Sequence, residues 1–451
     1  MSSILGTLNS AMQALDAQQG AIETTTANIA NSNTEGYSRR RPVFEECAPN
    51  SDGTPGGVTL ARVEALRDNV LDLRIQTETQ QQSADDAIAN ALQPVQLLFQ
   101  SGSNSIGDQI TNFFNALQSL STNPSDSSLR QSVLTAASNM ASAFQSASAQ
   151  ISQTQQNLDL KVNQDVNSVN ELTSQIAGIN TQIQTAEAEG HDATDLEDQR
   201  SQLLTSLSQV VDFSQFNDSE GVTLTTKDGT PLVIGGRSYA LTTSQDAAGH
   251  TLIYSGENDI TSSIQGGSIG GTLIARDQDL KGLQTSLDTL ASDLATGLNT
   301  ANAQGYDLNG VKGGDIFSFT AGSGAAASLK LAINDPTLIA ASSDGSSGGN
   351  GNLANLLSVQ NQTGSSGETP LNAYSGIVYQ IGSQISGAQA DSAASGTMLK
   401  QLQDQQGSIS GVSIDEETTN LLTYQRGYEA AARVITTVST LLDEAINLGK
   451  D

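Results

Sequence analysis

Two segments at opposite ends of the chain carry large apolar residues at heptad spacing. Near the N-terminus the row is Leu8, Leu15, Ile22 and Ile29. Near the C-terminus the row is Leu421, Tyr428, Ile435 and Leu442, with Tyr424 beside it. A helix with such a row has to pack it against other helices. We therefore expect the two ends to meet as a coiled-coil-like pair and to pack against further copies, which favours an assembly protein over a self-contained enzyme.

The length and composition of the chain favour several domains built from thin helical bundles. At 451 residues the chain exceeds what a single hydrophobic core usually holds. Only 4% of its residues are aromatic and none is tryptophan, so the core has to consist of Leu, Ile, Val and Ala. The formal net charge of −29 at pH 7 argues against binding to nucleic acid or to anionic membrane surfaces.

No targeting or disulfide pattern is recognisable. The first residues lack a basic region followed by an apolar stretch, so we expect no cleaved secretory signal. No run approaches the ~18 apolar residues of a membrane-spanning helix. Cys47 is the single cysteine and cannot form an internal disulfide. These criteria alone predict a cytosolic protein, unless an export route reads another signal.

The periodicity predicts a mainly α fold with β-rich inserts (α+β), built on an elongated helical bundle. The longest helix is expected over about 125–187, and a short turn at Gly190 leads into the next helix. That helix opens with Thr194 and Glu197 at the spacing of a capping box. Two long helices joined by a short turn form an antiparallel hairpin. Further along, Asp228-Gly229 between alternating apolar segments predicts a β-hairpin.

The predicted domains are nested in the sequence. A terminal helical assembly domain is expected to combine residues 1–40 and 408–451, with a connecting loop over 41–60. The helical-bundle domain, which resumes helical structure from about 61, is expected over 61–211, 273–304 and 372–407. A β-rich, Gly/Ser-rich insert is expected over 212–272 and 305–371.

The sequence contains no motif of a catalytic or metal site. His191 and His250 lie in glycine-containing turns without partners at metal-ligand spacing. There is no Gly-x-Ser-x-Gly nucleophile elbow and no phosphate-binding loop ending in Gly-Lys-Ser/Thr. The segment from Gly305 to Asp315 does not have the spacing of a calcium loop. We therefore expect no catalytic residues, no metal and no cofactor.

Two charged clusters invite a structural explanation. Asp415, Glu416 and Glu417 could act as an acid–base pair, but carboxylates in the first turn of a helix also complement its dipole, and we favour that role. Ser413 precedes them, and its spacing to Glu416 again matches a capping box. Arg39-Arg40-Arg41 is too short to bind nucleic acid in an acidic chain. It predicts surface salt bridges or contact with an acidic neighbouring subunit.

Short motifs mark both ends of the chain. At the N-terminal end they are Ala27-Asn28-Ile29-Ala30-Asn31-Ser32-Asn33 and Gly36-Tyr37. At the C-terminal end they are Asp415-Glu416-Glu417, Leu421, Tyr424-Gln425-Arg426, Tyr428 and Ala430. These motifs resemble the terminal signatures of the bacterial flagellar axial proteins. They do not separate rod, hook and junction proteins from one another.

Blocks in the interior narrow the resemblance. In chain order they are Phe113 to Leu120 with Asn123-Pro124, Asp195 to Arg200, Asp228 to Val233, Gly271 to Asp277, and Gly305 to Phe317. Their order is similar to that of the flagellar hook-associated protein 1 family, and the resemblance covers nearly the whole chain. Hook proteins have β-rich interiors without the long helical hairpin.

The resemblance implies a structural role at the junction between the flagellar hook and filament. It implies a ring of about eleven subunits, in contact with the hook protein and with the second junction protein, hook-associated protein 3. It also implies an extracellular location on the flagellum, reached by type III export from the cytoplasm without a cleaved signal peptide. An export chaperone that binds the C-terminal helix is implied as well.

The expected assembly interface combines the apolar rows with motif residues. Its members are Leu8, Leu15, Ile22, Asn28, Ile29, Asn31, Tyr37, Leu421, Tyr424, Tyr428, Ile435 and Leu442. An isolated amphipathic helix is marginal in water because packing supplies most of its stability. We therefore expect both ends to be largely disordered in the free monomer and to fold on incorporation.

Two alternative functions stay open at this point. A hook-type or distal-rod axial protein would share the end motifs. From a different class, the β-rich insert could carry a glycan-binding or hydrolase site. The scarcity of histidine and of nucleophile motifs argues against hydrolysis, although a pair of carboxylates could still support it.

Overall fold

The computed structural model describes residues 2–34, 36–49, 56–99, 105–218, 221–320 and 324–448. Its contacts divide the chain into two compact units. Unit 1 comprises Met1–Gln80, Ser168–Leu241 and Ser395–Asp451, and unit 2 comprises Gln81–Asn167 and Thr242–Ala394. Three long helices contribute residues to both units: α2 (Asn69–Phe99), α4 (Ser127–Ala188) and α10 (Pro370–Ser410). The prediction of a mainly helical fold with β-rich parts is confirmed.

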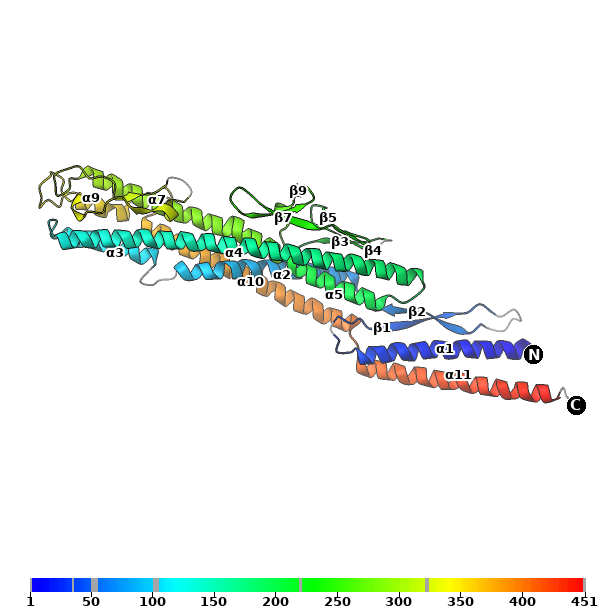
Figure 1. The fold of residues 1–451 in the computed structure, drawn as a ribbon. Helices are drawn as coiled ribbons and strands as arrows, with labels where there is room; N and C mark the ends of the chain where they lie inside the picture. Colours follow the sequence, from blue (N-terminus) through cyan, green and yellow to red (C-terminus); the bar gives the residue numbers. More distant parts are fainter. Residues whose placement is uncertain are drawn as a thin grey trace. The chain divides into compact units, whose positions relative to one another are not determined.

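The two ends of the chain pack together in unit 1. Helix α1 (Ser2–Ala30) and helix α11 (Ile414–Leu448) run antiparallel side by side (Figure 1). The buried positions of α1 are small or polar: Ala11, Ala17, Ala21, Thr24, Thr25 and Asn28. Side chains of this size allow neighbouring backbones to approach closely. The predicted pairing of the terminal helices is confirmed, and both helices are folded within one chain.

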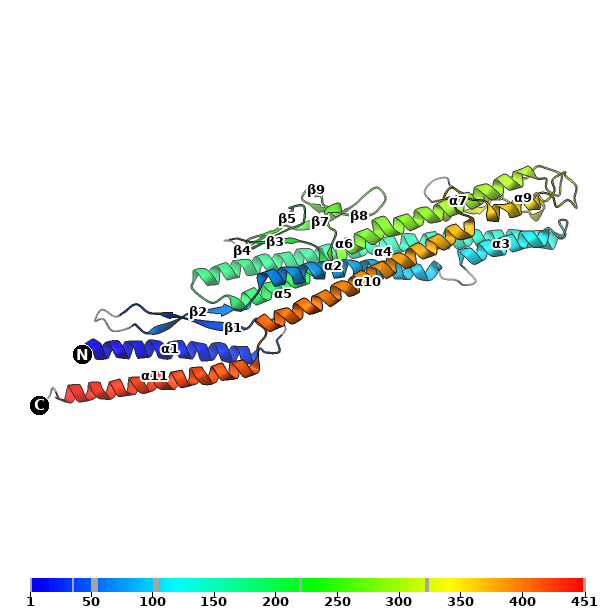
Figure 2. The same ribbon diagram turned by 180° about the vertical axis from the view of Figure 1, so that it is seen from behind.

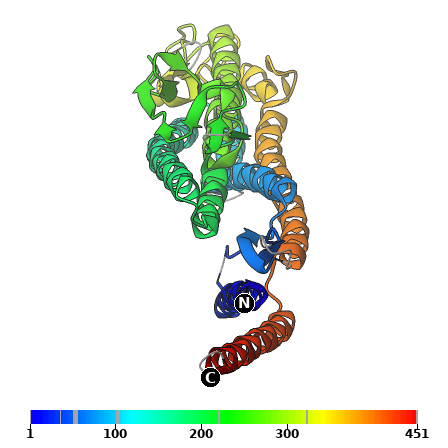
Figure 3. The same cartoon turned by 90° about the vertical axis from the view of Figure 1, so that its right-hand side faces the viewer.

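A β-hairpin covers another side of α1. Strands β1 (Arg40–Glu46) and β2 (Val58–Ala65) are antiparallel, with Arg40 opposite Ala65 and Glu46 opposite Val58. Figure 3 shows α1 between this hairpin and α11. Gly20 of α1 permits the contact, because a methyl group there would lie 2.5 Å from Leu60 Cδ2.

The hairpin corrects the sequence prediction for this part of the chain. The sequence predicts a connecting loop over 41–60 and a helix from about 61, but residues 58–65 form β2 and α2 begins at Asn69. Val58, Thr59 and Val63 are β-branched and suit a strand. Asp68 begins the helix, since its Oδ1 accepts hydrogen bonds from the backbone N–H of the second and third residues after it, at 3.0 and 3.2 Å. Residues 50–55 of the predicted loop lie outside the described residues.

Helix α5 (Thr194–Val210) begins differently from the predicted capping box. Its N-cap is Ala193, and the Thr194 side chain does not cap the helix. Asp192 Oδ1 accepts the Thr194 backbone N–H at 2.9 Å instead. Glu197 does not reach back to the cap, because its carboxylate pairs with Arg67 at 3.1 Å. The predicted capping box is therefore wrong, because the Arg67 guanidinium engages the Glu197 carboxylate that would complete it.

A four-stranded antiparallel sheet completes unit 1. Its order is β3-β4-β5-β6, with β3 (Ser214–Asp218), β4 (Gly221–Thr225), β5 (Pro231–Ile234) and β6 (Arg237–Ser238). The predicted turn at Gly229 is present, with φ of +88°. Asn180 of α4 anchors the sheet, since its Nδ2 donates to the carbonyl oxygens of Val222 and Gly235, both at 2.8 Å.

Unit 2 is a helical bundle with short irregular segments (Figure 2). Its own helices are α3 (Ile106–Leu120), α6 (Gly267–Ile274), α7 (Lys281–Gln304), α8 (Ala325–Ser328) and α9 (Leu353–Ser358). A π-helical turn over Ala275–Leu280 joins α6 to α7. The core is aliphatic with a few phenylalanines. Phe113 and Phe317, for example, meet edge to face at 6.1 Å between ring centres.

Short strands and turns decorate the bundle. They are β7 (Leu241–Gln245), β8 (Thr251–Ser255) and β9 (Asn258–Asp259) in one sheet, β10 (Phe317–Ser318) and β11 (Lys330–Leu331) in another, and 3-10 turns at Thr261–Ser263, Pro336–Leu338 and Val359–Asn361. Arg276 of the π-helical turn holds β8 against α4. Its buried Nη1 donates to Asp159 Oδ1 at 2.6 Å and to the Thr251 carbonyl oxygen at 2.8 Å.

Candidate assembly interface

The predicted apolar row of α1 is only half covered within the chain. Each of its members, Leu8, Leu15, Ile22 and Ile29, is of intermediate exposure. On the neighbouring face Leu5 is 56% exposed and Met12 is 53% exposed. Apolar surface gains roughly 25 cal/mol for each Å² removed from water. This side of α1 is therefore suited to a further apolar partner.

Helix α11 is covered even less. Leu421, Tyr424, Ile435 and Leu442 are of intermediate exposure, and Tyr428 is exposed. Among the described side chains of α11, only Glu417 and Val438 are buried. Leu422 and Leu441 are about half exposed, at 51% and 49%. The structure thus places the two helices that carry the apolar rows side by side. Contact of either row with another subunit stays a prediction.

A buried polar cluster, which we call the polar joint, connects the end of α1 to the start of α11. It consists of Asn28, Tyr37, Arg39, Arg40 and Glu417. Asn28 is at its centre and is 1% exposed. Its Oδ1 accepts hydrogen bonds from the Tyr37 hydroxyl and the Arg40 backbone N–H, both at 2.9 Å. Its Nδ2 donates to the Arg40 carbonyl oxygen at 2.7 Å and to Glu417 Oε2 at 2.9 Å.

Arg39 balances the charge of the buried carboxylate in the polar joint. Glu417 is 2% exposed, and its Oε1 lies 2.8 Å from Arg39 Nε. Arg39 Nη1 lies 2.7 Å from Glu416 Oε2, so Glu416 is engaged by a cation as well. A buried carboxylate needs such a partner, because the loss of hydration is otherwise uncompensated. The acidic start of α11 therefore has a specific tertiary partner in addition to the helix dipole.

Arg40 extends the polar joint to helix α5. Its Nη2 pairs with Asp195 and lies 3.7 Å from Asp198 Oδ2. Burial lowers the pKa of this guanidinium, but the hydrogen bond to Asp195 and the nearby carboxylates outweigh burial and raise the pKa above its usual value. Arg67 also pairs with Asp198 and donates from Nε to Ser38 Oγ at 2.9 Å. The predicted salt bridges of the arginine cluster form. Glu417 and Asp198 are buried partners, whereas Glu416 and Asp195 are exposed.

Tyr37 serves as a neutral donor in the polar joint. The Arg40 guanidinium lies over the Tyr37 ring, with Arg40 Cζ 5.0 Å from the ring centre. Burial raises the pKa of the Tyr37 hydroxyl, so it keeps its proton and donates to Asn28. Asn31 lies apart from the joint, in the turn after α1. There its Nδ2 donates to the Ala27 carbonyl oxygen at 3.0 Å.

Several residues of this network escape sequence reasoning. Arg67, Asp195 and Asp198 carry no motif that marks them as partners of Arg40. The available signal was three consecutive arginines in a chain of strongly negative charge. Arg40 and Asp195 are 155 residues apart, so pattern reading could not pair them.

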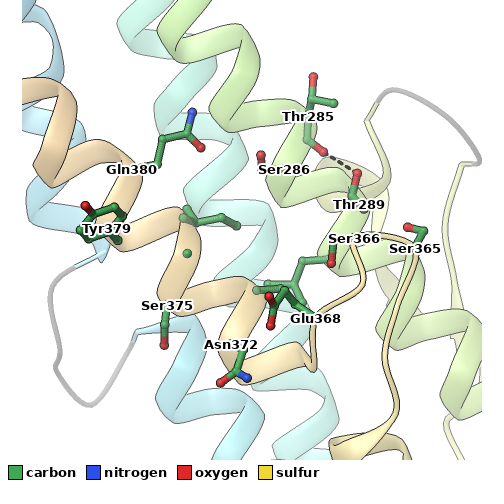
Figure 4. Close-up of a pocket in the computed structure, with 14 residues that line it drawn as sticks. Thr285, Ser286, Thr289, Ser365, Ser366, Glu368, Asn372, Ser375, Tyr379 and Gln380 are labelled. Atoms are coloured by element: carbon green, nitrogen blue, oxygen red, sulfur yellow. Dashed lines mark hydrogen bonds between the residues drawn. The ribbon is translucent and has the colours of Figure 1, made fainter.

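A cleft in unit 2 lacks a catalytic arrangement among its described lining residues. It has a volume of about 910 Å³ and lies between α7 and α10 (Figure 4). Hydroxyl and amide side chains line it, including Thr285, Ser286 and Asn372, and Glu368 is the one carboxylate among its described lining residues. Acid–base hydrolysis of a glycosidic bond generally needs two carboxylates. This cleft therefore gives no support to a hydrolase function.

The histidines are engaged locally. His191 Nδ1 lies 3.4 Å from Glu189 on the surface, and His250 Nδ1 lies 3.4 Å from Asp159. Within the described ranges, no group of three or more His, Cys, Asp or Glu side chains could hold a metal ion. None of the helices described is long and apolar enough to cross a bilayer.

Family profiles match three parts of the chain. The flagellar hook-associated protein FlgK helical domain matches residues 91–317. The C-terminal profile of the flagellar basal body rod FlgEFG proteins matches residues 405–448, and that of the flagella basal body rod proteins matches residues 8–37. The two rod-type profiles thus match the segments that form most of α1 with the following turn, and α11 with the end of α10.

Full-length relatives place the chain in one family. It is 31% identical to flagellar hook-associated protein 1 of Bacillus subtilis, over 99% of both chains. It is 26% identical to the protein of that name from Escherichia coli, over 98% of this chain and 99% of the other. The structure of the flagellar hook junction protein FlgK from Burkholderia pseudomallei has a similar fold, with a TM-score of 0.68 at 19% identity, and covers 74% of this chain and all of that one. The chain therefore belongs to the flagellar hook-associated protein 1 family and is a structural, non-enzymatic component of the bacterial flagellum.

Proposed function

We propose that this chain forms a ring of about eleven copies between hook and filament, held together by its terminal helices. The observation that carries the proposal is the incomplete coverage of α1 and α11. Leu5, Met12, Leu422 and Leu441 stay about half exposed although both helices are folded and paired. Contiguous apolar surface on a folded protein marks an interaction site. Copies that pack side by side would cover both helices at once.

The proposed partners are axial proteins on either side of the ring. They are the hook protein below and hook-associated protein 3 above. We also propose an extracellular location, reached by type III export without a cleaved signal peptide, and a chaperone that covers the C-terminal helix before export. The apolar side chains exposed on α11 support such a chaperone, because they would otherwise promote premature association.

The domains have separate roles in this proposal. Residues 1–40 and 408–451 form the assembly domain, and the β1–β2 hairpin joins them because it packs on α1. The helical segments over 61–211, 273–304 and 372–407 act as a stiff spacer with an aliphatic core. The segments over 212–272 and 305–371 carry the short strands, and the second of them also supplies core residues such as Phe317 and Leu356 to the bundle.

Charged substitutions in the apolar row of α11 test the role of the terminal helices. Ile435→Asp and Leu442→Asp place a carboxylate on a face that is to be covered by other helices. We expect both variants to fold in unit 2 and to build no filaments in a strain that lacks the native chain. Leu160→Asp on α4 is the matched control, because Leu160 is 63% exposed and lies outside the terminal helices. Electron microscopy of the cells gives the readout, and filaments of normal number on either variant would refute the proposal.

A deletion strain tests the place of the chain in the flagellum. Cells without the chain should keep their hooks and lose their filaments, and gold-labelled antibody on intact flagella should mark the hook–filament boundary. Loss of the hooks in the deletion strain, or antibody label along the rod, would contradict a location at the hook–filament junction.

A further inference from the structure

The charges of the two terminal helices are few and regularly placed. Helix α1 contains only two charged residues, Asp16 and Glu23, which are both acidic and seven residues apart. Helix α11 contains only two basic residues, Arg426 and Arg433, which are also seven residues apart. Seven residues are close to two helical turns, so each pair lies on one face of its helix, about 10 Å apart.

Both pairs lie on the faces that point away from the contact between α1 and α11. All four side chains are exposed. Among the described residues, none of the four comes within 4.0 Å of an opposite charge. Glu23 accepts a hydrogen bond from Gln19 at 3.1 Å, and Glu429 lies between the two arginines without an ion pair. The acidic face of α1 also carries Leu5 and Met12. The face of α11 with the two arginines, which we call its basic face, also carries Leu422 and, three turns beyond each arginine, the exposed Asp415 and Glu444.

We propose that the acidic face of α1 in one copy packs against the basic face of α11 in the next copy. The occupant of each face is thus a second copy of this chain. The inference rests on the proposed function, because it assumes that copies meet through their terminal helices. Opposite charges at equal spacing beside apolar side chains favour one partner and one register, as they do in coiled coils.

The contact between α1 and α11 within one chain gives the reference from which the register between copies is measured. Asn28 bonds to Glu417, and Gln18 lies against Gly427, ten residues further along each helix in antiparallel order. Continuing this antiparallel alignment by two residues places Asp16 level with Glu429 of its own chain. A rotation about an axis along the helices keeps the antiparallel order but leaves level residues level, so the charge pairing also requires a translation along that axis. Asp16 then faces Arg433 of the next copy, and Glu23 faces Arg426.

The pairing predicts an offset between neighbouring copies. Relative to the contact within one chain, α1 is shifted by four residues along α11 of the next copy. At the rise of an α-helix this is about 6 Å along the helices. Both charge pairs give the same shift, because the two acidic residues and the two basic residues have equal spacing.

Charge reversal and its rescue test the pairing in flagella assembled from the full chain. Asp16→Lys with Glu23→Lys puts like charges in contact, as does Arg426→Glu with Arg433→Glu. We expect each double variant to lower the number of filaments per cell about tenfold or more, and the chain with all four changes to restore it. Glu171→Lys with Glu187→Lys on α4 makes the same change in net charge as the double variant of α1 and should leave filaments unchanged.

The outcomes separate this register from the proposed function. If both double variants lose filaments and their combination does not restore them, the register is wrong. If neither double variant loses filaments while Ile435→Asp does, the terminal helices assemble without this pairing. If none of these variants loses filaments, the proposed function fails together with the pairing.

Cysteine cross-linking gives a second readout that does not depend on filament number. In a Cys47→Ser background, Asp16→Cys with Arg433→Cys should form a ladder of disulfide-linked multimers on oxidation of isolated flagella. Asp16→Cys with Arg426→Cys is the matched control, because it displaces one cysteine by two turns on the same face. A ladder from the control pair, or none from the first pair, would overturn the register.

Discussion

Asn28 makes four hydrogen bonds although its side chain is almost fully buried. It accepts from Tyr37 and from the Arg40 backbone, and it donates to the Arg40 backbone and to Glu417. The Asn28 side-chain amide thus links the end of α1 to strand β1 and to the start of α11. Groups left unpaired in a buried site each cost about 1 to 3 kcal/mol.

Asn28→Ala should therefore destabilise unit 1. We expect the free energy of unfolding to fall by about 3 kcal/mol, because Glu417 and the Arg40 backbone lose partners. Urea unfolding followed by circular dichroism measures the change. Asn31→Ala is the control, since Asn31 bonds only within its own turn, and it should cost less than about 1 kcal/mol. Equal losses in the two variants would show that the polar joint does not stabilise the helix pair.

Asp279 makes the stability of unit 2 depend on pH. Burial raises the pKa of this carboxyl from 3.8 to about 6, although the hydrogen bond from Gln384 opposes the shift. An acid whose pKa rises on folding holds its proton more tightly in the folded state. The free energy of unfolding therefore falls as pH rises from 3.8 to about 6.

Asp279→Asn should remove this dependence. Because the carboxyl is only partly shielded from water, we expect the variant to be about 1 kcal/mol more stable at pH 7 and equal to the parent near pH 3.5. Thermal unfolding across this pH range measures the difference. Asp404→Asn, at an exposed position of α10, should change stability little at any pH. A parent and an Asp279→Asn variant with parallel pH profiles would exclude the effect.

Helices α1 and α11 should be the least protected long helices of the free monomer. Their apolar rows are half covered, whereas Val162 and Val169 of α4 are fully buried. Packing supplies most of the stability of such helices. The structure shows the pair formed, and the expectation that both ends are largely disordered in the free monomer stays a prediction.

Amide hydrogen exchange measures that opening. We expect fast exchange at Leu15, Ile22, Ile435 and Leu442 in the monomer, slow exchange at Val162 and Val169, and strong protection of all six in assembled flagella. Slow exchange at the first four positions in the monomer would contradict the idea that these ends fold on incorporation.

Helix α6 approaches α2 at a glycine. A methyl group on Gly271 would lie 2.0 Å from the Ala84 carbonyl oxygen, which is backbone and cannot move aside. Gly271→Ala should therefore lower the free energy of unfolding by about 3 kcal/mol. Gly282→Ala in α7 is the control, since its nearest neighbour would be 3.9 Å away. It should raise stability by up to about 1 kcal/mol, as alanine favours helix, and two changes of the same sign in thermal unfolding would refute the packing argument.

For the whole molecule, helical periodicity predicted most of the elements. The long helix α4, the turn at Gly190, the hairpin turn at Gly229 and the pairing of the two ends all follow from local patterns. Strands β1 and β2 were missed because several prolines in this stretch suggested a loop, and because the hairpin is held by contact with Gly20 and its neighbours on α1.

The polar joint was only partly predictable for a different reason. The resemblance to a family predicted Asn28 and Tyr37 as interface residues between subunits. In the structure both side chains instead form hydrogen bonds with residues of the same chain. Their partner Glu417 is 389 residues away from Asn28, and its carboxylate had an adequate local explanation at the start of a helix. No periodic pattern links two such positions, because their contact is a property of the folded unit.

The distance along the chain between Asn28 and Glu417 has a consequence for biosynthesis. The ribosome releases Asn28, Tyr37 and both arginines long before it makes the carboxylate that completes their bonding. A truncated product that ends before residue 417 would leave Asn28 and Arg39 without that partner. Closure of this cluster therefore requires that translation has passed residue 417.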